Sequence, residues 1–354
     1  MKVLDDAKSV KKIDKSNMVD LLTGFPDQCK NAFEIGRAFS APQSYNGFEN
    51  IVFSGLGGSA IGADLLRSYL SDEIKIPVLV NRDYTIPYFV GSETLFIACS
   101  YSGDTEETLA SYEEAKKREA KIIVISSGGK LEAAAKEDDV PFISIPKGYP
   151  PRTALGFAFF PWLAVLAKMG LIGDKKADVS EAVSVMENLR DYNLNISIEA
   201  ARNPAKRLAL NLKGKYIIIY AANRFLDSVI VRLRGQFEEN SKTLASTHVF
   251  PEMNHNETVG WENPKKLLKD FVVVILRDES EHPRVTRRID ITKSIIKKKT
   301  KIIEVPSKGA SLLSRIFYLI YTGDFTSYYL AILNKRDPTP VEMVGYLKKE
   351  LSKF

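Results

Sequence analysis

Short apolar runs alternate with longer segments of helical spacing in the first half of the chain. The runs are typical of buried strands and the segments of helices, which carry apolar residues every three or four positions. Strands are predicted at 51–54, 76–81, 95–100, 121–126 and 141–145, and helices at 60–70, 106–118 and 130–136. Strands that alternate with helices in this way indicate a parallel sheet with helices on both faces.

The alternation stops and then restarts in the second half. A long helical region covers 155–212, after which strands are predicted at 216–220, 271–276 and 301–305, and helices at 226–240 and 285–298. The first forty residues and residues 310–334 are also predicted to be helical. The predicted fold class is α/β, with two doubly wound parallel-sheet halves that repeat in pattern. We expect an N-terminal helical segment, a first sheet, linking helices, a second sheet and C-terminal helices, at 1–40, 41–152, 153–213, 214–308 and 309–354.

Two apolar stretches of the sequence could indicate a membrane-spanning helix or an interface with a partner chain. Residues 153–173 approach the roughly 20 apolar residues that a membrane-spanning helix needs, but Pro161 and Lys168 interrupt them. We therefore expect a buried helix here and no membrane partner. Residues 154–166 and 316–330 hold more apolar side chains than one small α/β half needs for its own core, which favours a homodimer.

Composition and charge narrow the classes of function. Of 354 residues, 45% are hydrophobic and 27% are charged, which is ordinary for a soluble globular protein. The formal net charge is +6, but the basic runs lack interleaved aromatic residues, so no nucleic-acid partner is expected. Cys29 and Cys99 form no disulfide or metal motif and the N-terminus has no signal peptide, which favours the cytoplasm. No cluster of histidine and carboxylate has metal-ligand spacing, so neither a metal nor a cofactor is expected.

Two loops of small residues, at 54–62 and 100–105, follow predicted strands and precede predicted helices. Backbone N–H groups at such helix starts bind anions. The hydroxyl groups of Ser100, Ser102 and Thr105 add further donors. The lysine-containing P-loop motif is absent from the sequence. These loops therefore predict a cradle for one phosphate on a neutral body, such as a sugar phosphate.

Two dense polar clusters lie between apolar elements of the second half. They read Gln-Phe-Glu-Glu-Asn-Ser-Lys at 236–242 and Pro-Glu-Met-Asn-His-Asn-Glu at 251–257. Side chains of this kind serve acid–base chemistry better than packing. Spacing alone leaves open the alternative of an exposed helix end and a solvated loop.

Together these motifs resemble those of the bifunctional phosphoglucose/phosphomannose isomerases, a family of the sugar-isomerase (SIS) domain superfamily. The matching stretches are 54–62, 100–108, 151–156, 236–242, 251–257, 323–330 and 337–341. The resemblance implies two SIS-type αβα sandwiches and a homodimer whose active site is shared across the interface. It also implies metal-independent interconversion of glucose and mannose 6-phosphates with fructose 6-phosphate through a cis-enediolate.

The resemblance assigns catalytic roles that suit the chemistry of each side chain. Glu239 would move the proton between C2 and C1. Arg152 would stabilise the charge that develops on the enediolate oxygens. His255 would open the sugar ring, because histidine titrates near neutrality. Lys348 matches the family's C-terminal lysine and would assist ring opening.

Other residues complete the predicted site. The phosphate would be bound by Gly58, Ser59, Ser100, Ser102 and Thr105, and Thr339 would lie near C2 and C3 of the sugar. Glu238 is the rival of Glu239, and Lys349 is the rival of Lys348. His248 and His282 are expected to be surface or loop residues. Asp104 departs from the family, where many members carry a neutral amide, and its charge would repel the phosphate unless it points outward or pairs with a cation.

Other functions remain open at this stage. One is an amino-sugar phosphate isomerase, or another aldose–ketose isomerase, of a different SIS family. Another is a catalytically silent sugar-phosphate sensor, which needs the cradle but no base. The joint presence of Glu239, His255 and Arg152 favours catalysis over sensing.

Overall fold

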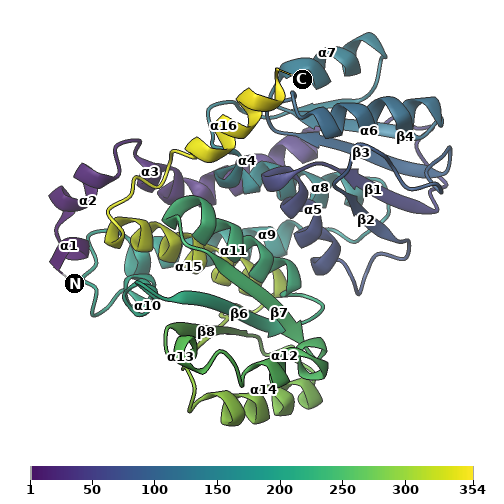
Figure 1. Ribbon diagram of the computed structural model, residues 1–354. Coiled ribbons are helices and arrows are strands. Elements are labelled where there is room, and N and C mark those ends of the chain that lie inside the picture. The colour runs from purple at the N-terminus through teal and green to yellow at the C-terminus, as the bar shows by residue number, and fades with distance from the viewer. Residues whose placement is uncertain (1, 354) are drawn as a thin grey trace.

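Apolar, β-branched runs form two parallel sheets in this computed structural model, which describes residues 2–353 (Figure 1). The first sheet has the strand order β2-β1-β3-β4-β5 and the second the order β7-β6-β8-β9. The strands are β1 (Asn50–Ser54), β2 (Val78–Asn81), β3 (Thr94–Ser100), β4 (Lys121–Ser126), β5 (Phe142–Ser144), β6 (Tyr216–Ala222), β7 (Ala245–Phe250), β8 (Phe271–Arg277) and β9 (Lys301–Pro306). All neighbouring strands run parallel. The α/β class with two parallel-sheet halves is thus confirmed.

Helices connect the strands and fill the space between the sheets. The connecting helices are α5 (Gly57–Tyr69), α6 (Glu106–Lys117), α7 (Gly129–Glu137), α11 (Asp227–Ser241), α12 (Glu257–Gly260), α13 (Lys265–Leu268) and α14 (Pro283–Ile296). The others are α1 (Lys2–Asp5), α2 (Ala7–Ile13), α3 (Met18–Thr23), α4 (Phe25–Ala38), α8 (Leu155–Lys168), α9 (Lys176–Leu189), α10 (Pro204–Leu212), α15 (Leu312–Leu333) and α16 (Glu342–Leu351). Short turns of other helix types are η1 (Pro151–Thr153), η2 (Arg190–Leu194) and η3 (Glu252–His255).

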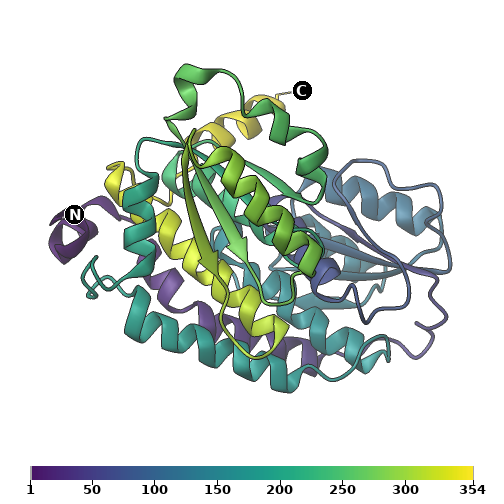
Figure 2. The same ribbon diagram turned by 90° about the horizontal axis from the view of Figure 1, so that it is seen from below.

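One hydrophobic core joins the two halves of the chain. α8 packs on α4 and α5, and α15 packs on α9, α10 and α11, so these helices lie between the sheets in Figure 1. α4 and α8 touch backbone to backbone, because a Cβ added to Gly36 would lie 2.2 Å from the carbonyl oxygen of Pro161. α14 covers the opposite face of the second sheet (Figure 2). The two halves are therefore parts of one packed unit.

The two apolar stretches that the sequence sets apart are α8 and α15. Both are buried inside this chain, where the ring of Phe317 lies 4.8 Å from that of Phe160 and 5.2 Å from that of Phe159. The prediction that 153–173 holds a buried helix is confirmed. Among residues 2–353, no helix is long and apolar enough to cross a membrane. Each helix finds its apolar partners within one chain, so these two segments give no support for a homodimer, which stays a prediction.

The sequence analysis missed β7. This strand reads Ala-Ser-Thr-His-Val-Phe, and its four central residues are only half-buried at the edge of the second sheet. Only its two end residues, Ala245 and Phe250, are buried, so the strand lacks the apolar run from which the other strands were predicted. His248, expected in a loop or on the surface, is half-buried in this strand, whereas His282 caps the start of α14 by accepting from the N–H of Arg284.

Candidate active site

The predicted phosphate cradle forms where β1 and β3 end side by side, with Ser54 in register with Ala98. The Ser100 Oγ and Thr105 Oγ1 atoms lie 2.8 Å apart, and the N–H of Tyr101 donates to Ser59 Oγ at 3.2 Å. Ser102 is exposed at the rim of the loop. α5 and α6 both begin without a side-chain cap, which leaves their first N–H groups open to an anion. The structure therefore gathers the hydroxyl groups and two helix starts in one place.

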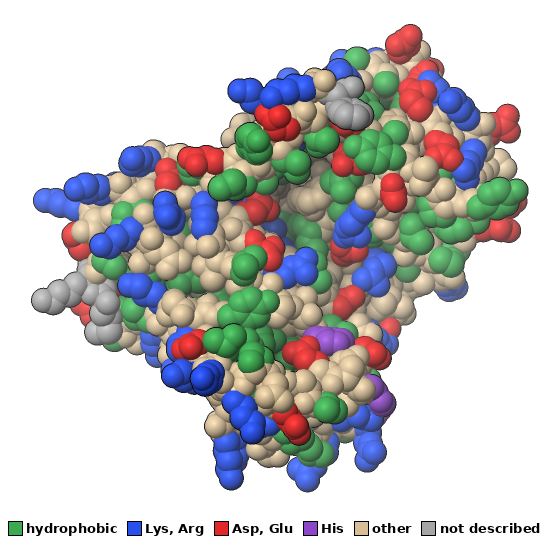
Figure 3. Space-filling model, viewed as in Figure 1, with side chains coloured by type: hydrophobic (Ala, Val, Ile, Leu, Met, Phe, Trp, Pro, Cys, Tyr) green, Lys and Arg blue, Asp and Glu red, His purple; other side chains and the backbone are tan. Residues whose placement is uncertain are grey.

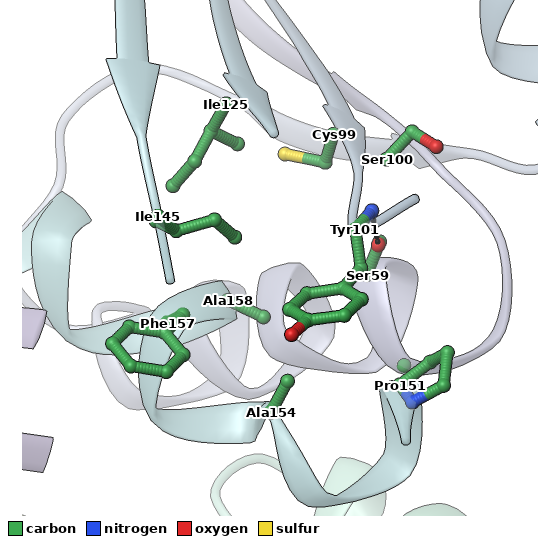
Figure 4. Close-up of a pocket in the computed structure, with 11 residues that line it drawn as sticks. Ser59, Cys99, Ser100, Tyr101, Ile125, Ile145, Pro151, Ala154, Phe157 and Ala158 are labelled. Carbon is green, nitrogen blue, oxygen red and sulfur yellow. Dashed lines mark hydrogen bonds between the residues drawn. The ribbon is translucent and has the colours of Figure 1, made fainter. Parts of the chain in front are cut away.

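Gly58 lies against the turn that precedes α8. A Cβ at this position would come within 2.5 Å of the carbonyl oxygen of Pro151. Only glycine permits this approach, which brings η1 beside the cradle. Behind the cradle lies a cavity of about 20 Å³, where the Tyr101 ring points inward among Ile145, Ala154 and Phe157 (Figure 4). This cavity has room for about one water molecule, which is too little for a sugar phosphate.

Asp104 turns its carboxylate toward the start of α7. Its Oδ1 atom accepts from the N–H of Lys130 at 3.1 Å, and its own N–H donates to Ser102 Oγ at 3.3 Å. A carboxylate is stabilised at a helix N-terminus. The charge of Asp104 is therefore stabilised at the start of α7, which would offset its repulsion of a phosphate in the predicted cradle.

Arg152 connects the cradle to the second half of the chain. Its side chain is 5% exposed, and its Nη2 atom donates to the carbonyl oxygens of Pro338 and Thr339 at 2.8 Å each. Its Nε atom donates to Asn240 Oδ1 at 2.6 Å. Its Nη1 atom lies 3.4 Å from Glu239 Oε2. Burial lowers the pKa of Arg152, and the neighbouring charge of Glu239 opposes this shift.

Glu239 lies on α11 at the edge of a cavity of about 200 Å³. The lining also includes Arg152, Gln236 and the cradle residues Gly57 and Gly58. Its side chain is 44% exposed, so the carboxylate is accessible beside a buried guanidinium. Glu238, its rival, is not among the lining residues, and its carboxylate lies 3.9 Å from Arg234. Figure 3 shows the surface hollowed between the two halves, with acidic and basic side chains around the hollow.

Buried polar residues that the sequence analysis did not assign support this cavity from beneath. Arg232 Nη2 donates to Asp324 Oδ2 at 2.7 Å, and Gln236 Nε2 donates to Asp324 Oδ1 at 2.7 Å. Arg232 also donates to the carbonyl oxygen of Arg152 at 3.3 Å. Burial raises the pKa of Asp324, and Arg232 opposes this shift. Two features of the sequence could have revealed these contacts. Polar residues recur at every fourth position of α11 (Arg232, Gln236 and Asn240), and the apolar helix α15 contains one acidic residue, Asp324.

Lys242 holds the loop that carries Thr339. It ends α11 in a left-handed conformation with φ of 54°. Its ammonium donates to the carbonyl oxygens of Glu239 at 2.8 Å, Asp337 at 3.0 Å and Pro338 at 3.1 Å. Partial burial, together with the charge of Arg152, lowers the pKa of Lys242 to about 8. Thr339 Oγ1 is buried with no hydrogen-bond partner among the described residues.

Two predicted catalytic residues lie apart from this cluster. His255 is exposed at the end of η3, and Lys348 is exposed on α16, a helix with no buried residue. Within residues 2–353 neither side chain forms a hydrogen bond or an ion pair, so no such contact ties them to Glu239. Likewise, no group of three or more His, Cys, Asp or Glu in this range is placed to hold a metal ion.

Comparisons with known proteins bear on the family of the chain. A family model of the SIS domain matches residues 47–147, and a model described as the bacterial phospho-glucose isomerase C-terminal SIS domain matches residues 201–351. The bifunctional phosphoglucose/phosphomannose isomerase of Caldicellulosiruptor bescii is 45% identical over 95% of this chain and 99% of its own length. The chain belongs to the bifunctional phosphoglucose/phosphomannose isomerase family. It is a sugar-phosphate isomerase, built from two SIS domains.

Further relatives agree with this assignment. The enzyme of the same description from Aquifex aeolicus is 37% identical over 86% of this chain and 91% of its own length. A hypothetical protein from Thermus thermophilus has the same fold, with a TM-score of 0.76 at 17% identity over 98% of this chain and 93% of that chain. Because this chain is an isomerase, the silent-sensor alternative is wrong.

Proposed function

We propose that this isomerase interconverts glucose 6-phosphate and mannose 6-phosphate with fructose 6-phosphate in the cavity lined by α5, η1 and α11. The observation that supports this most directly is the position of Glu239. Its accessible carboxylate lies beside the buried guanidinium of Arg152, in a cavity that also touches the phosphate cradle at Gly58. A base and a cation at one end and an anion site at the other suit an aldose or ketose phosphate.

Glu239 acts as the base in this proposal. It removes the proton from C2 of the aldose and returns it to C1, while the hydroxyl proton on O2 passes to O1, so that the carbonyl group moves from C1 to C2. The intermediate is a cis-enediolate, which both epimers share because C2 becomes planar. A carboxylate within hydrogen-bonding reach of both carbons can carry out both transfers.

Arg152 stabilises the enediolate. Its Nε and Nη2 atoms are held by Asn240 and by two carbonyl oxygens, while the one contact of Nη1 among the described residues is the longer one of 3.4 Å to Glu239. A guanidinium fixed before the substrate arrives needs little reorganisation as negative charge develops. Nη1 is the donor with the most freedom to turn toward the substrate oxygens.

The phosphate binds to the hydroxyl groups of Ser59, Ser100, Ser102 and Thr105, with the first N–H groups of α5 and α6. Anion binding at helix starts supports this assignment. Thr339 contacts the sugar near C2 and C3, and its unpartnered buried hydroxyl supports such a role. No step of this scheme requires a metal or a cofactor.

Ring opening requires a homodimer in this proposal. His255 is exposed on its own protomer, so it can reach the active site of a second copy across an interface. α16 supports the dimer independently, because Met343, Tyr346 and Leu347 are 83%, 66% and 57% exposed on a helix with no buried residue. Such an apolar surface is usual at an interface. Lys348, on the same helix, assists His255.

We also propose a cytoplasmic location. Both cysteines of the chain, Cys29 and Cys99, are buried and unpaired. Unpaired thiols are usual where the environment is reducing.

An activity assay tests the proposal. The purified protein is incubated with fructose 6-phosphate, with and without a chelator, and glucose 6-phosphate and mannose 6-phosphate are measured separately. We expect both products in both conditions. Formation of neither product, or of an amino-sugar phosphate alone when ammonia is supplied, would contradict the proposal. Loss of activity with the chelator would contradict its metal independence.

A further inference from the structure

Gly235 lies in the middle of α11, where glycine is an unfavourable choice. A glycine in a helix interior destabilises the helix by about 1 kcal/mol relative to alanine. Its backbone is helical, with no positive φ that would require glycine. Glycine at position 235 therefore lowers the stability of α11, and the surroundings of this position must explain its presence.

Close packing does not explain this glycine. A Cβ added to Gly235 would meet no heavy atom of residues 2–353 within 4 Å. The other glycines around the site differ in this respect. A Cβ on Gly55 would lie 2.7 Å from the carbonyl oxygen of Cys99, one on Gly58 would lie 2.5 Å from that of Pro151, and Gly57 has a φ of +52°. Those three glycines are explained by the fold, whereas Gly235 is not.

The open space beside Gly235 is the catalytic cavity. Gly235 lines the same cavity of about 200 Å³ as Glu239, Arg152 and Gly58. It precedes Glu239 by four positions, so the two residues lie on one face of α11, one turn apart. A side chain at position 235 would therefore project into the space between the base and the cradle.

We propose that Gly235 is a specificity-determining residue, which carries no side chain so that the carbon chain of a hexose 6-phosphate can lie against α11 between the cradle and Glu239. This inference rests on the proposed function, which puts the phosphate in the cradle and C1 and C2 at Glu239. The sugar then has to cross the face of α11 at position 235. A methyl group there occupies volume that the substrate needs, while leaving both ends of the site intact.

Gly235→Ala tests this role with opposite effects on stability and binding. Alanine favours the helix and meets no neighbour, so the thermal midpoint should stay the same or rise. One methylene in a binding pocket changes discrimination by about 10- to 200-fold, so KM for fructose 6-phosphate should rise by at least about tenfold. Inorganic phosphate fills only the cradle, so its inhibition constant should not change. Gly235→Val should raise KM further.

Ser184→Ala is the matched control, because it adds helix propensity on an exposed face of α9, outside the cavity lining. It should leave KM unchanged. An unchanged KM in Gly235→Ala would overturn the proposal, as would a lower thermal midpoint, a change in oligomeric mass or an equal weakening of phosphate inhibition. If the unaltered protein does not isomerise fructose 6-phosphate, the proposed function fails instead. Active unaltered protein with an unaffected Gly235→Ala variant refutes only the role of Gly235.

Discussion

Arg152 Nε donates to Asn240 Oδ1 at 2.6 Å, across 88 positions of the sequence. This hydrogen bond joins the turn beside the phosphate cradle to the helix that carries Glu239. Asn240 is itself held, because its Nδ2 atom donates to Ser327 Oγ on α15 at 2.9 Å. The spacing between the proposed phosphate site and the proposed base, Glu239, thus depends on a chain of buried hydrogen bonds through α11 and α15.

Replacing the base should abolish turnover and spare binding. Glu239→Gln keeps the size of the side chain but cannot accept the proton. General base catalysis is worth about 10²–10⁴-fold, so kcat should fall by at least that factor with both glucose and mannose 6-phosphates. Exchange of the C2 hydrogen with solvent, followed by NMR, should stop as well. Glu238→Gln is the control and should retain most activity. If Glu238→Gln were inactive and Glu239→Gln active, the base would be Glu238 instead of Glu239.

Removing hydroxyl groups from the cradle should weaken substrate binding. A hydrogen bond to a charged group contributes about 1.5–3 kcal/mol, so Ser100→Ala and Thr105→Ala should each raise KM for fructose 6-phosphate by about tenfold or more. Inhibition by inorganic phosphate should weaken in parallel, and circular dichroism should show an unchanged fold. An unchanged KM in both variants would refute the cradle.

Breaking the buried ion pair between Arg232 and Asp324, beneath the cavity, should lower the free energy of unfolding more than breaking an ion pair on the surface. Arg232 and Asp324 are 4% and 5% exposed. Removing one partner of a buried pair costs about 3–5 kcal/mol, so Asp324→Ala should lower the free energy of unfolding in urea by roughly that amount. Glu34→Ala is the control, since its partner Arg37 lies on the surface and such pairs contribute about 0–1 kcal/mol. Both variants are compared at one protein concentration; equal losses would contradict the prediction.

Lys242 should set an alkaline limit on activity. Its lowered pKa of about 8 means that the ammonium loses its charge above that pH and grips the Asp337 and Pro338 carbonyl oxygens less firmly. We expect kcat/KM to fall as the pH rises through about 8, and Lys242→Arg, which stays charged, should move this limb to higher pH. A limb unmoved in Lys242→Arg would show that another group titrates.

The same group has the opposite effect on stability. The folded pKa of about 8 lies below the ordinary value of 10.5, so the unfolded chain binds more protons between these values. The contribution of Lys242 to the free energy of unfolding therefore rises with pH in this window. Urea unfolding of the unaltered protein and of Lys242→Met at pH 8 and 10 checks the sign, since the variant should lack this increase.

Mixed dimers should reveal a shared active site. If His255 acts across the interface, a His255→Ala chain paired with a Glu239→Gln chain leaves one of the two sites complete. Activity should return when the two inactive variants are unfolded, mixed and refolded together. Differently tagged chains confirm that mixed dimers form, and no rescue in such dimers would mean that each chain uses its own His255.

Most strands and helices of this protein were predictable from the sequence. Periodicity and chain order determine the parallel strands and their connecting helices. The small-residue loops that follow β1 and β3 lie close together, because neighbouring parallel strands end at the same edge. β7 escaped this reasoning. An edge strand buries few of its side chains, so its sequence carries little of the hydrophobic signal.

Only the tertiary structure decided what surrounds the predicted residues. The pairing of α11 with α15 puts Asp324 under Arg232 and Ser327 under Asn240, and no local pattern specifies which helix faces which. The apolar segments at 154–166 and 316–330 likewise looked like an interface in the sequence and became the interior of one chain. The hydrophobic effect is non-directional. A sequence therefore shows that an apolar segment must be buried, but only the packed structure shows which segment or which chain buries it.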